Sequence, residues 1–187
     1  QISIDGTGKV RCPQPAQVGD NLPIGGKTYY VVDQDALISV VETGSFTVSP
    51  VTYTPADLSC VCTSQVTDTS NLFDRIGTYG RDNLNADISN WDVSNVVNMS
   101  GMFANARFFN SPLDSWEVNK VEDMSEMFLN AIRFDQTLEN WQVGEVINMS
   151  GMFKNAQRFN KPLNNWTVDK VENMSEMFRA TRLFDQP

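Results

Sequence analysis

The stretch ISNWDVSNVVNMSGMF, from Ile88 to Phe103, returns three times in altered form at a constant interval. The later copies are LDSWEVNKVEDMSEMF from Leu113, LENWQVGEVINMSGMF from Leu138 and LNNWTVDKVENMSEMF from Leu163. Each copy keeps its tryptophan, two valines, two methionines and a phenylalanine at the same places, and a second phenylalanine follows at a fixed distance. Spacing this regular predicts an internal structural repeat with a period of about 25 residues.

The register can be followed backwards from the first full copy. The residues that match its valine, methionine and phenylalanine columns are Val66, Thr69, Leu72 and Phe73. The repeats are therefore predicted to start near Val61, and the segment from Phe73 to Leu84 is then five residues longer than in later copies. A second period, twice as long, is present because NMSGMF alternates with MSEMF, which indicates duplication of a two-repeat unit. We call it the double period.

Two local patterns predict the structure of one repeat. Met99, Met102, Phe103 and Ala106 have the i, i+3, i+4, i+7 spacing of one face of a short helix. The segment Trp116–Val118 alternates like a short strand. A unit of this length cannot bury its aromatic side chains alone, so neighbouring coils must stack, with each tryptophan against its counterpart in the next coil. The predicted fold class is an α/β repeat solenoid whose coils each hold one short strand and one short helix.

Residues 1–59 share none of this periodicity and are predicted to form an N-terminal capping subdomain. Residues 27–32 (KTYYVV) are typical of a strand, and Asp33 then caps a helix that ends at Gly44. The helix residues expected to face inward are Leu37, Val40 and Val41. A strand and a helix placed here would cover the open apolar edge of the first coil.

Residues 60–187 are predicted to form the solenoid, with four to five repeats. The chain begins at Gln1 without a signal peptide and stops inside the repeat pattern. We therefore interpret it as a processed piece of a longer exported protein, truncated at its C-terminal end.

Composition excludes several classes of function. The chain has 14 basic and 23 acidic residues and no run of basic residues, which disfavours nucleic acid as a partner. It has no histidine, which excludes serine–histidine and cysteine–histidine nucleophiles and histidine-ligated zinc. No stretch approaches the roughly 18 apolar residues of a transmembrane helix, so membrane insertion is not expected.

The three cysteines lie in the first third of the chain, at Cys12, Cys60 and Cys62. A disulfide from Cys12 to Cys60 or to Cys62 would staple the cap and would fit an oxidising compartment. Alternate residues of a strand share a face, so the pattern does not choose between the two partners. The alternative is three free, buried thiols.

The phrases ISNWDVSNVVNMSGMF and VTDTSNLF (residues 66–73) resemble the BspA-like leucine-rich-repeat surface proteins of bacteria. The resemblance is to their surface-protein repeat, which has a similar length and is also found in mycoplasma lipoproteins, and it covers residues 61–187. It implies leucine-rich-repeat-like coils, a location outside the cell or on its surface, and a role in adhesion. It carries no catalytic motif and no cofactor.

A candidate ligand face follows from the columns beside the predicted strands, which vary from coil to coil while the core columns do not. These columns contain Asp92, Glu117, Gln142 and Thr167, with Ser94, Asn119, Gly144 and Asp169 beside them. They favour a non-catalytic binding or adhesion module that recognises an extracellular protein or a glycan through its repeated strand face. Ordinary solvated strand edges are the alternative interpretation.

Three further hypotheses follow from the same residues. The chain could be a structural spacer or a self-assembly module that stacks end to end through its last coil. Asp92 and Glu117 could act as the acid and base of a glycoside hydrolase, but a flat ladder offers no cleft that would raise one pKa, so no enzyme activity is predicted. No cofactor is expected either, although residues 5–8 (DGTG) match a fragment of a calcium loop and leave calcium as an alternative.

Overall fold

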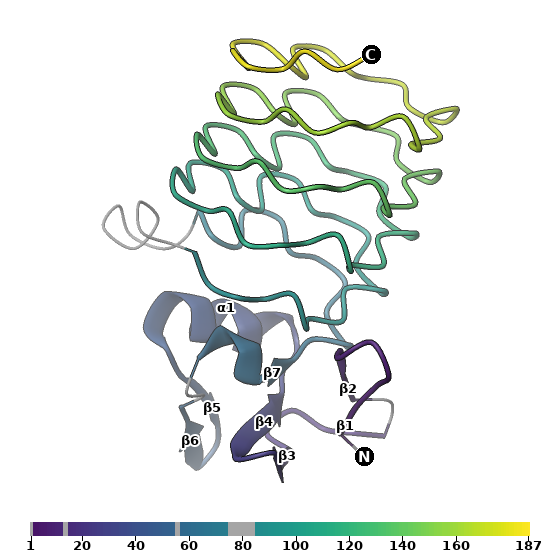
Figure 1. Cartoon of the computed structure of the whole chain (residues 1–187). Helices are drawn as coiled ribbons and strands as arrows, with labels where there is room; N and C mark the ends of the chain where they lie inside the picture. Colours follow the sequence, from purple (N-terminus) through teal and green to yellow (C-terminus); the bar gives the residue numbers. More distant parts are fainter. Residues whose placement is uncertain (1, 13–14, 55–56, 75–84) are drawn as a thin grey trace.

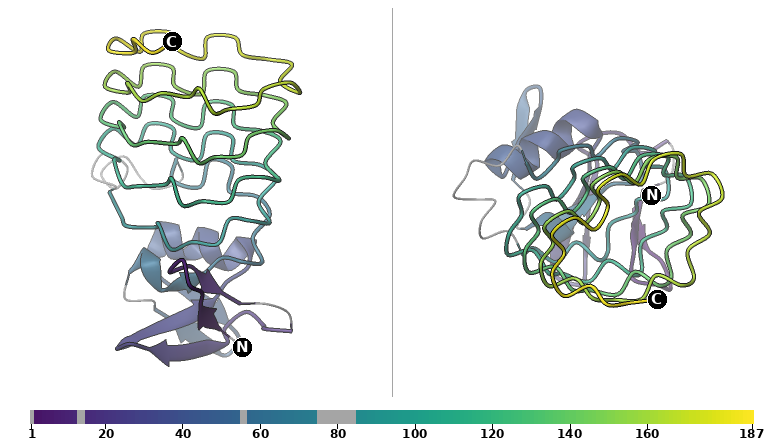
Figure 2. Two further views of the ribbon diagram at one scale, coloured as in Figure 1. Left: turned by 45° about the vertical axis from the view of Figure 1, so that its right-hand side comes forward. Right: turned by 90° about the horizontal axis from the view of Figure 1, so that it is seen from above.

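The structure, a computed structural model, describes residues 2–12, 15–54, 57–74 and 85–187. Short strands and a helix form the N-terminal end of the molecule, and layers of chain are stacked above them toward the C-terminus (Figure 1). We number these layers one to five, and their first residues are Val61, Ile88, Leu113, Leu138 and Leu163. Viewed along the stack, the layers lie over one another as similar loops (Figure 2).

The strands of the described residues are short and precede the layers. The antiparallel hairpins are β1 (Ser3–Ile4) with β2 (Val10–Arg11), and β5 (Phe46–Val48) with β6 (Val51–Tyr53). A third sheet has the order β3 (Asn21–Ile24), β4 (Lys27–Val31), β7 (Val61–Cys62). In that sheet β3 and β4 are antiparallel, whereas β4 and β7 are parallel, so β7 leads from the N-terminal sheet into layer one.

The helix α1 (Gln34–Thr43) closes the lower end of the stack. Its N-cap Asp33 accepts a hydrogen bond from the backbone of Ala36, and Gly44 ends it in the left-handed conformation, with φ of 80°. Its buried side chains belong to the same hydrophobic cluster as the residues of layer one. The strand and the helix predicted for residues 27–44 are therefore confirmed, including both caps.

Aromatic stacks run through the layers. The rings of Trp91 and Trp116 are 6.4 Å apart and nearly parallel, and those of Trp141 and Trp166 are 6.3 Å apart. The phenylalanines stack in two columns, which are Phe73, Phe103, Phe128, Phe153, Phe178 and Phe109, Phe134, Phe159, Phe184. The prediction that tryptophans lie against their counterparts is confirmed for these two pairs, and the columns form one continuous core with α1.

Backbone hydrogen bonds join neighbouring layers at every second residue. Between layers two and three, four N–H groups donate to carbonyl oxygens at 2.7–2.9 Å, and these bonds run from Met99 to Asp123, Gly101 to Ser125, Phe103 to Met127 and Asn105 to Leu129. The same four bonds recur between layers three and four and between layers four and five.

The first two layers are joined with a different offset. The bond that corresponds to the one from Met99 to Asp123 runs from Thr69 to Asn98, so its partners lie five positions further apart in the sequence. This offset confirms the predicted register and its five extra residues, although residues 75–84 themselves lie outside the described chain.

The predicted fold class, an α/β leucine-rich-repeat-like solenoid with a strand and a helix in each coil, is wrong. Among the described residues, α1 is the sole α-helix, the sheets are small and N-terminal, and the layers contain turns and isolated parallel bridges. The segment predicted as helical takes positive φ at Gly101 (60°) and Asn105 (62°). These left-handed residues break the helix, and the N–H groups of Gly101, Phe103 and Asn105 bond to the next layer instead of to carbonyls within the segment.

Side chains at the start of this segment hold single turns. Asn98 and Asp123 each accept a hydrogen bond from the backbone N–H of the serine two residues later, at 2.9 and 2.8 Å. The asparagines at 105, 130 and 155 form a column of turn residues, and all three have φ near 60°. Their side chains also bond to one another from layer to layer at 2.8 Å.

The double period has a packing explanation. One column of left-handed residues reads Gly101, Glu126, Gly151, Glu176. A Cβ atom at Gly151 would lie 3.3 Å from Cγ of Glu126 in the layer below, which is tighter than ordinary contact. A glutamate therefore covers a glycine in the next layer, and this alternation requires two layers for one full repeat.

Candidate ligand-binding face

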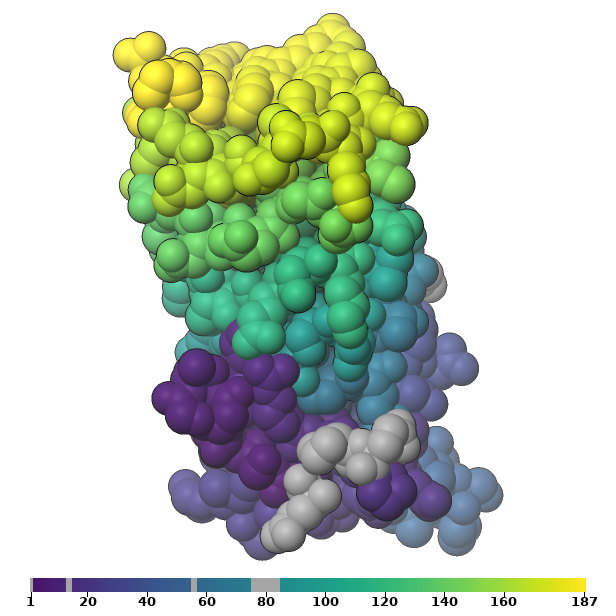
Figure 3. Space-filling model, turned by 90° about the vertical axis from the view of Figure 1, so that its right-hand side faces the viewer, coloured from purple at the N-terminus to yellow at the C-terminus, as the bar shows by residue number. Residues whose placement is uncertain are grey.

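The β1–β2 hairpin lies along the side of layers two and three, where the purple segment rests against the layers in Figure 3. Its tight turn is held by Asp5, whose carboxylate accepts hydrogen bonds from the backbones of Thr7 and Lys9 at 2.9 and 3.1 Å. The N–H of Val10 donates to the carbonyl of Asn90 in layer two at 3.0 Å. Beyond the hairpin, a disulfide joins Cys12 to Cys62.

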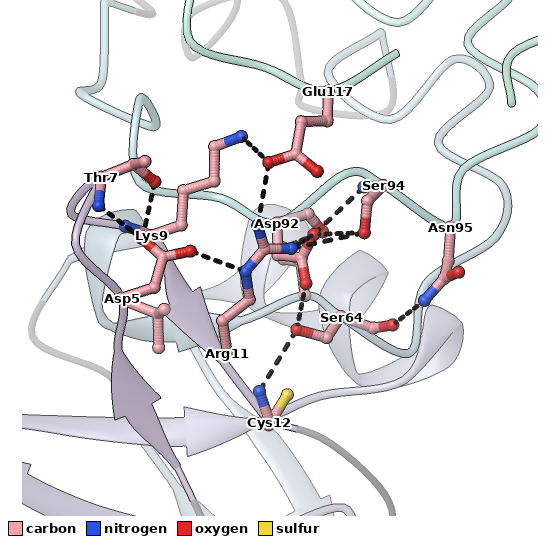
Figure 4. A network of polar contacts seen from close by, with 12 residues as sticks. Asp5, Thr7, Lys9, Arg11, Cys12, Ser64, Asp92, Ser94, Asn95 and Glu117 are labelled. Carbon is pink, nitrogen blue, oxygen red and sulfur yellow. Dashed lines mark hydrogen bonds and ion pairs between the residues drawn. The ribbon is translucent and has the colours of Figure 1, made fainter. Parts of the chain in front are cut away.

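An ionic network centred on Arg11 fastens this hairpin to the layers (Figure 4). The guanidinium group of Arg11 contacts Asp5 at 2.9 Å, Asp92 of layer two at 2.6 Å and Glu117 of layer three at 2.9 Å. The ammonium group of Lys9, which is almost fully buried, also bonds to Glu117 at 2.9 Å. Two cations therefore satisfy carboxylates from two successive layers.

Sequence analysis missed this role of Lys9 and Arg11. Residues at alternate positions of a strand project to the same face, so both cations point toward the acidic column while Val10 packs in the core behind them. The signal that could have found the contact is the pattern basic, apolar, basic at residues 9–11. It lies far from the acidic column in the sequence, and only the disulfide and the hairpin bring the two together.

The network stabilises the ionised carboxylates. Burial opposes ionisation of Asp92, but hydrogen bonds from Ser64, Ser94 and Arg11 outweigh it and lower the pKa of this carboxyl below its ordinary value of 3.8. The hydrogen bond from Lys9, with the charges of Lys9 and Arg11, lowers the pKa of Glu117 below 4.5. Hydrogen bonds from Thr7 and Arg11 lower the pKa of Asp5 as well.

The predicted ligand face is thus divided into two parts. Asp92 is buried, with 3% of its surface exposed, and Ser94 donates a hydrogen bond to it at 2.7 Å, so both lie in the contact with the hairpin. Glu117 is exposed but is bound to Lys9 and Arg11. The predicted residues that stay open to solvent are Asn119, Gln142, Thr167 and Asp169, while Gly144 is partly covered.

Two adjoining depressions run along this open part of the face. The first has a volume of about 450 Å³ and is lined by residues that include Glu117, Asn119 and Gln142. The second, of about 320 Å³, shares Asn119 and Gln142 and adds Gly144 and Thr167. We call this surface the polar groove and define it by these five residues. It starts beside the hairpin and crosses layers three to five.

A third depression, of about 640 Å³, lies on the other side of the Arg11 network. Its lining includes Arg11, Cys12, Gln65 and Asp92. The polar groups of Arg11 and Asp92 are already paired with each other across this wall. The polar groove therefore offers more unpaired polar side chains to a ligand than this depression does.

The geometry bears on the catalytic and metal hypotheses. A general acid needs a carboxyl whose pKa is raised toward neutrality, whereas the pKa values of Asp92 and Glu117 are both lowered. The Asp5 turn that matches part of a calcium loop uses its carboxylate for Thr7, Lys9 and Arg11. Within the described residues, no group of three or more histidine, cysteine, aspartate or glutamate side chains is placed to hold a metal ion.

The cysteine arrangement explains why the pattern left two partners open. Cys62 belongs to β7 and points into the cluster around Cys12, Val10 and Val31, and the disulfide forms there. Cys60 belongs to the preceding 3-10 turn (Leu58–Cys60) and is a buried free thiol. Cys60 and Cys62 therefore do not lie on one strand, contrary to the expectation from the sequence pattern.

Comparison with known proteins adds one match. None of the helices in the described ranges has both the length and the apolar character that a membrane crossing requires. No curated protein and no solved structure matches the chain. One family model matches it twice, at residues 45–145 and 113–187, and together these cover the layers and the last part of the N-terminal region. The expected similarity to a mycoplasma repeat is confirmed at this level, and the chain belongs to the family described as "Mycoplasma protein of unknown function, DUF285".

Proposed function

We propose that the chain is a non-catalytic binding module that recognises a glycan or a protein along the polar groove. The observation that carries the proposal is the continuity of the groove, since Asn119 and Gln142 line both of its depressions. Side chains from successive layers project into it at intervals of about 5 Å, the spacing of hydrogen-bonded backbones. An extended ligand can therefore contact several layers at once.

The groove chemistry suits a hydroxyl-rich or peptide ligand. Amide side chains of asparagine and glutamine each donate and accept hydrogen bonds, and a threonine hydroxyl does both. These groups match the alternating donors and acceptors of sugar hydroxyls or of an extended peptide backbone. The lowered pKa values of Asp92 and Glu117 keep these carboxyls ionised beside the groove, which favours a role in binding over a role in proton transfer.

A location outside the cell or on its surface is part of the proposal. The Cys12–Cys62 disulfide fits an oxidising compartment. The resemblance of the repeat to BspA-like surface proteins supports the same location and a role in adhesion. The membership in a family of unknown function neither names a ligand nor opposes one.

A second candidate, a spacer or assembly module, is favoured by the last layer. Val168 and Met174 are 37% and 43% exposed, whereas their counterparts Val143 and Met149 are buried. Layer five also presents backbone N–H and carbonyl groups without partners among the described residues, because groups of both kinds join the lower layers to one another. Light scattering over a concentration series tests this candidate, because only an assembling chain grows.

The groove is tested with a panel of immobilised glycans and extracellular-matrix proteins. A Cβ atom at Gly144 would meet no atom within 4 Å, so Gly144→Tyr can fill the groove without disturbing the layers. We expect Gly144→Tyr and the triple variant Asn119→Ala, Gln142→Ala, Thr167→Ala to lose binding. The control is Glu122→Ala with Glu172→Ala, which alters exposed residues of the same stack outside the groove. Undiminished binding by both groove variants would reject the proposal.

A further inference from the structure

A line of arginines marks one corner of the layers. Layers two to five each carry one arginine at the same two-residue turn, and these residues are Arg107, Arg133, Arg158 and Arg182. All four are exposed. We call this line the arginine edge. It involves none of the residues of the polar groove.

The backbone brings the arginines of successive layers next to one another. The N–H of Arg133 donates to the carbonyl of Arg107 at 3.1 Å, and the N–H of Arg158 donates to the carbonyl of Ile132 at 3.3 Å. The turn of layer five is joined in the same way, from Leu183 to Gln157 at 3.3 Å. Hydrogen-bonded backbones lie about 5 Å apart, so the turns that carry the arginines follow one another at roughly this interval along the stack.

The charge around this corner is opposite to that of the rest of the protein. Residues 104–111, 129–136, 154–161 and 179–186 carry seven of the chain's 14 basic residues and two of its 23 acidic residues. No run of basic residues exists in the sequence, because the repeat distributes them at intervals of about one period. The stack collects them on one edge of an otherwise acidic molecule.

The guanidinium groups of this edge lack ionic partners within the described residues. The neighbouring basic residues are paired, since Lys161 contacts Asp135 at 3.1 Å, and Lys154 and Arg179 both contact Glu176 at 2.5 Å. By contrast, no carboxylate in the described part of the chain lies within ion-pair distance of Arg107, Arg158 or Arg182. Arg133 lies over the ring of Phe108, 4.4 Å from its centre, which holds the side chain without neutralising it.

We propose that the arginine edge binds a linear acidic polysaccharide that runs along the stack, with its carboxylate or sulfate groups on successive arginines. Guanidinium groups bind such oxyanions through paired hydrogen bonds. A polymer with an acid group on each sugar can contact the arginines of several layers at once. This inference rests on different residues from the proposed function, so either can fail alone.

Two other polyanions fit less well. In an extended acidic peptide, side chains on one face recur about every 7 Å, which is longer than one layer. Single-stranded nucleic acid gains much of its affinity by stacking bases on aromatic rings, but the exposed ring of Phe108 is covered by Arg133.

The test measures binding of the whole chain to heparin and polygalacturonate, with dextran as the neutral control and polyglutamate and polyuridylate as rivals. The edge variant is Arg107→Gln, Arg158→Gln, Arg182→Gln, which leaves Arg133 on its ring. The matched control is Lys27→Gln, Lys120→Gln, Lys170→Gln, which removes three charges from exposed lysines elsewhere. Melting temperatures of all three proteins check that the variants fold.

We expect an acidic polysaccharide to bind the natural chain, with affinity that falls as salt is added. The edge variant should bind about tenfold more weakly or worse, and the control should stay within about twofold. The proposal is overturned if no acidic polysaccharide binds, if both variants lose affinity equally, or if polyglutamate or polyuridylate binds more tightly. The single variant Arg158→Gln, expected to weaken binding by about two- to threefold, decides the matter if the triple variant does not fold.

Discussion

The indole nitrogen of Trp141 donates a hydrogen bond of 2.9 Å to the carbonyl oxygen of Leu113 in the layer below. The same bond joins Trp116 to Ile88 at 3.1 Å and Trp166 to Leu138 at 3.0 Å. Each tryptophan therefore fills the core of its own layer and also satisfies a buried carbonyl of the preceding one. This explains why the same column holds tryptophan in all four full repeats.

Replacing Trp141 by phenylalanine should destabilise the protein by about 2–4 kcal/mol, because Leu113 loses a buried donor and a small cavity forms. Urea unfolding measures the free energy. Trp166→Phe is the matched control, since Trp166 makes the same bond in the last, partly exposed layer. Its loss should be about 1–2 kcal/mol. Equal losses at both positions would contradict the argument.

Asn130 tests the asparagine column, because it has φ of 58°, donates a side-chain hydrogen bond to Asn105 and accepts one from Asn155. Asn130→Ala should cost about 2–3 kcal/mol, since it loses both bonds and alanine adopts the left-handed region less readily than asparagine. Asn130→Gly keeps the conformation and should cost about 1–2 kcal/mol. If glycine is as harmful as alanine, the backbone conformation contributes nothing measurable.

Gly151 should resist substitution more than Gly144. Gly151 has φ of 60° and its added Cβ would press on Glu126, so Gly151→Ala should cost about 1–2 kcal/mol. Gly144→Ala meets open space and should change stability by less than about 0.5 kcal/mol. Urea unfolding of the two variants side by side makes the comparison. A cost at Gly144 that matched the cost at Gly151 would refute the packing explanation of the double period.

The disulfide between Cys12 and Cys62 closes a loop with a sequence separation of 50. Its removal by Cys12→Ser with Cys62→Ser should lower stability by about 2–4 kcal/mol. Thiol titration of the natural chain under denaturing, non-reducing conditions should find one free thiol, and Cys60→Ala should have none. Two or more thiols in the reducing-agent-free chain would show that Cys12 is not bonded to Cys62.

Acid should weaken the attachment of the hairpin. The pKa values of Asp5, Asp92 and Glu117 are lowered in the folded protein, so their stabilising effect is complete above the ordinary values of 3.8 and 4.5. As the pH falls below about 4.5, the unfolded chain binds protons first and stability decreases. Thermal unfolding between pH 2.5 and 7 measures this slope. Arg11→Gln should flatten it, and Lys27→Gln, whose partner Asp57 is exposed, should not.

The repeat period and the identity of the buried columns could be read from the chain alone. Both depend only on spacing along the chain, since a side chain that must stack on its counterpart has to recur at a constant interval. The helix α1 was equally predictable, because Asp33 and Gly44 cap its two ends through interactions with residues close to them in the sequence. The order of the layers followed from the period as well.

The backbone path within a layer could not be read in this way. Spacing of Met99, Met102, Phe103 and Ala106 fits a helix, but hydrogen bonds to the next layer compete with those within the segment, and left-handed residues decide the outcome. Residues distant in the sequence decided the candidate site too. The hairpin covers Asp92, the sheet directs Cys62 and not Cys60 to Cys12, and the stack assembles the arginine edge from residues about one period apart. Such contacts depend on which surfaces pack together in the folded protein, and a local sequence pattern does not determine this packing.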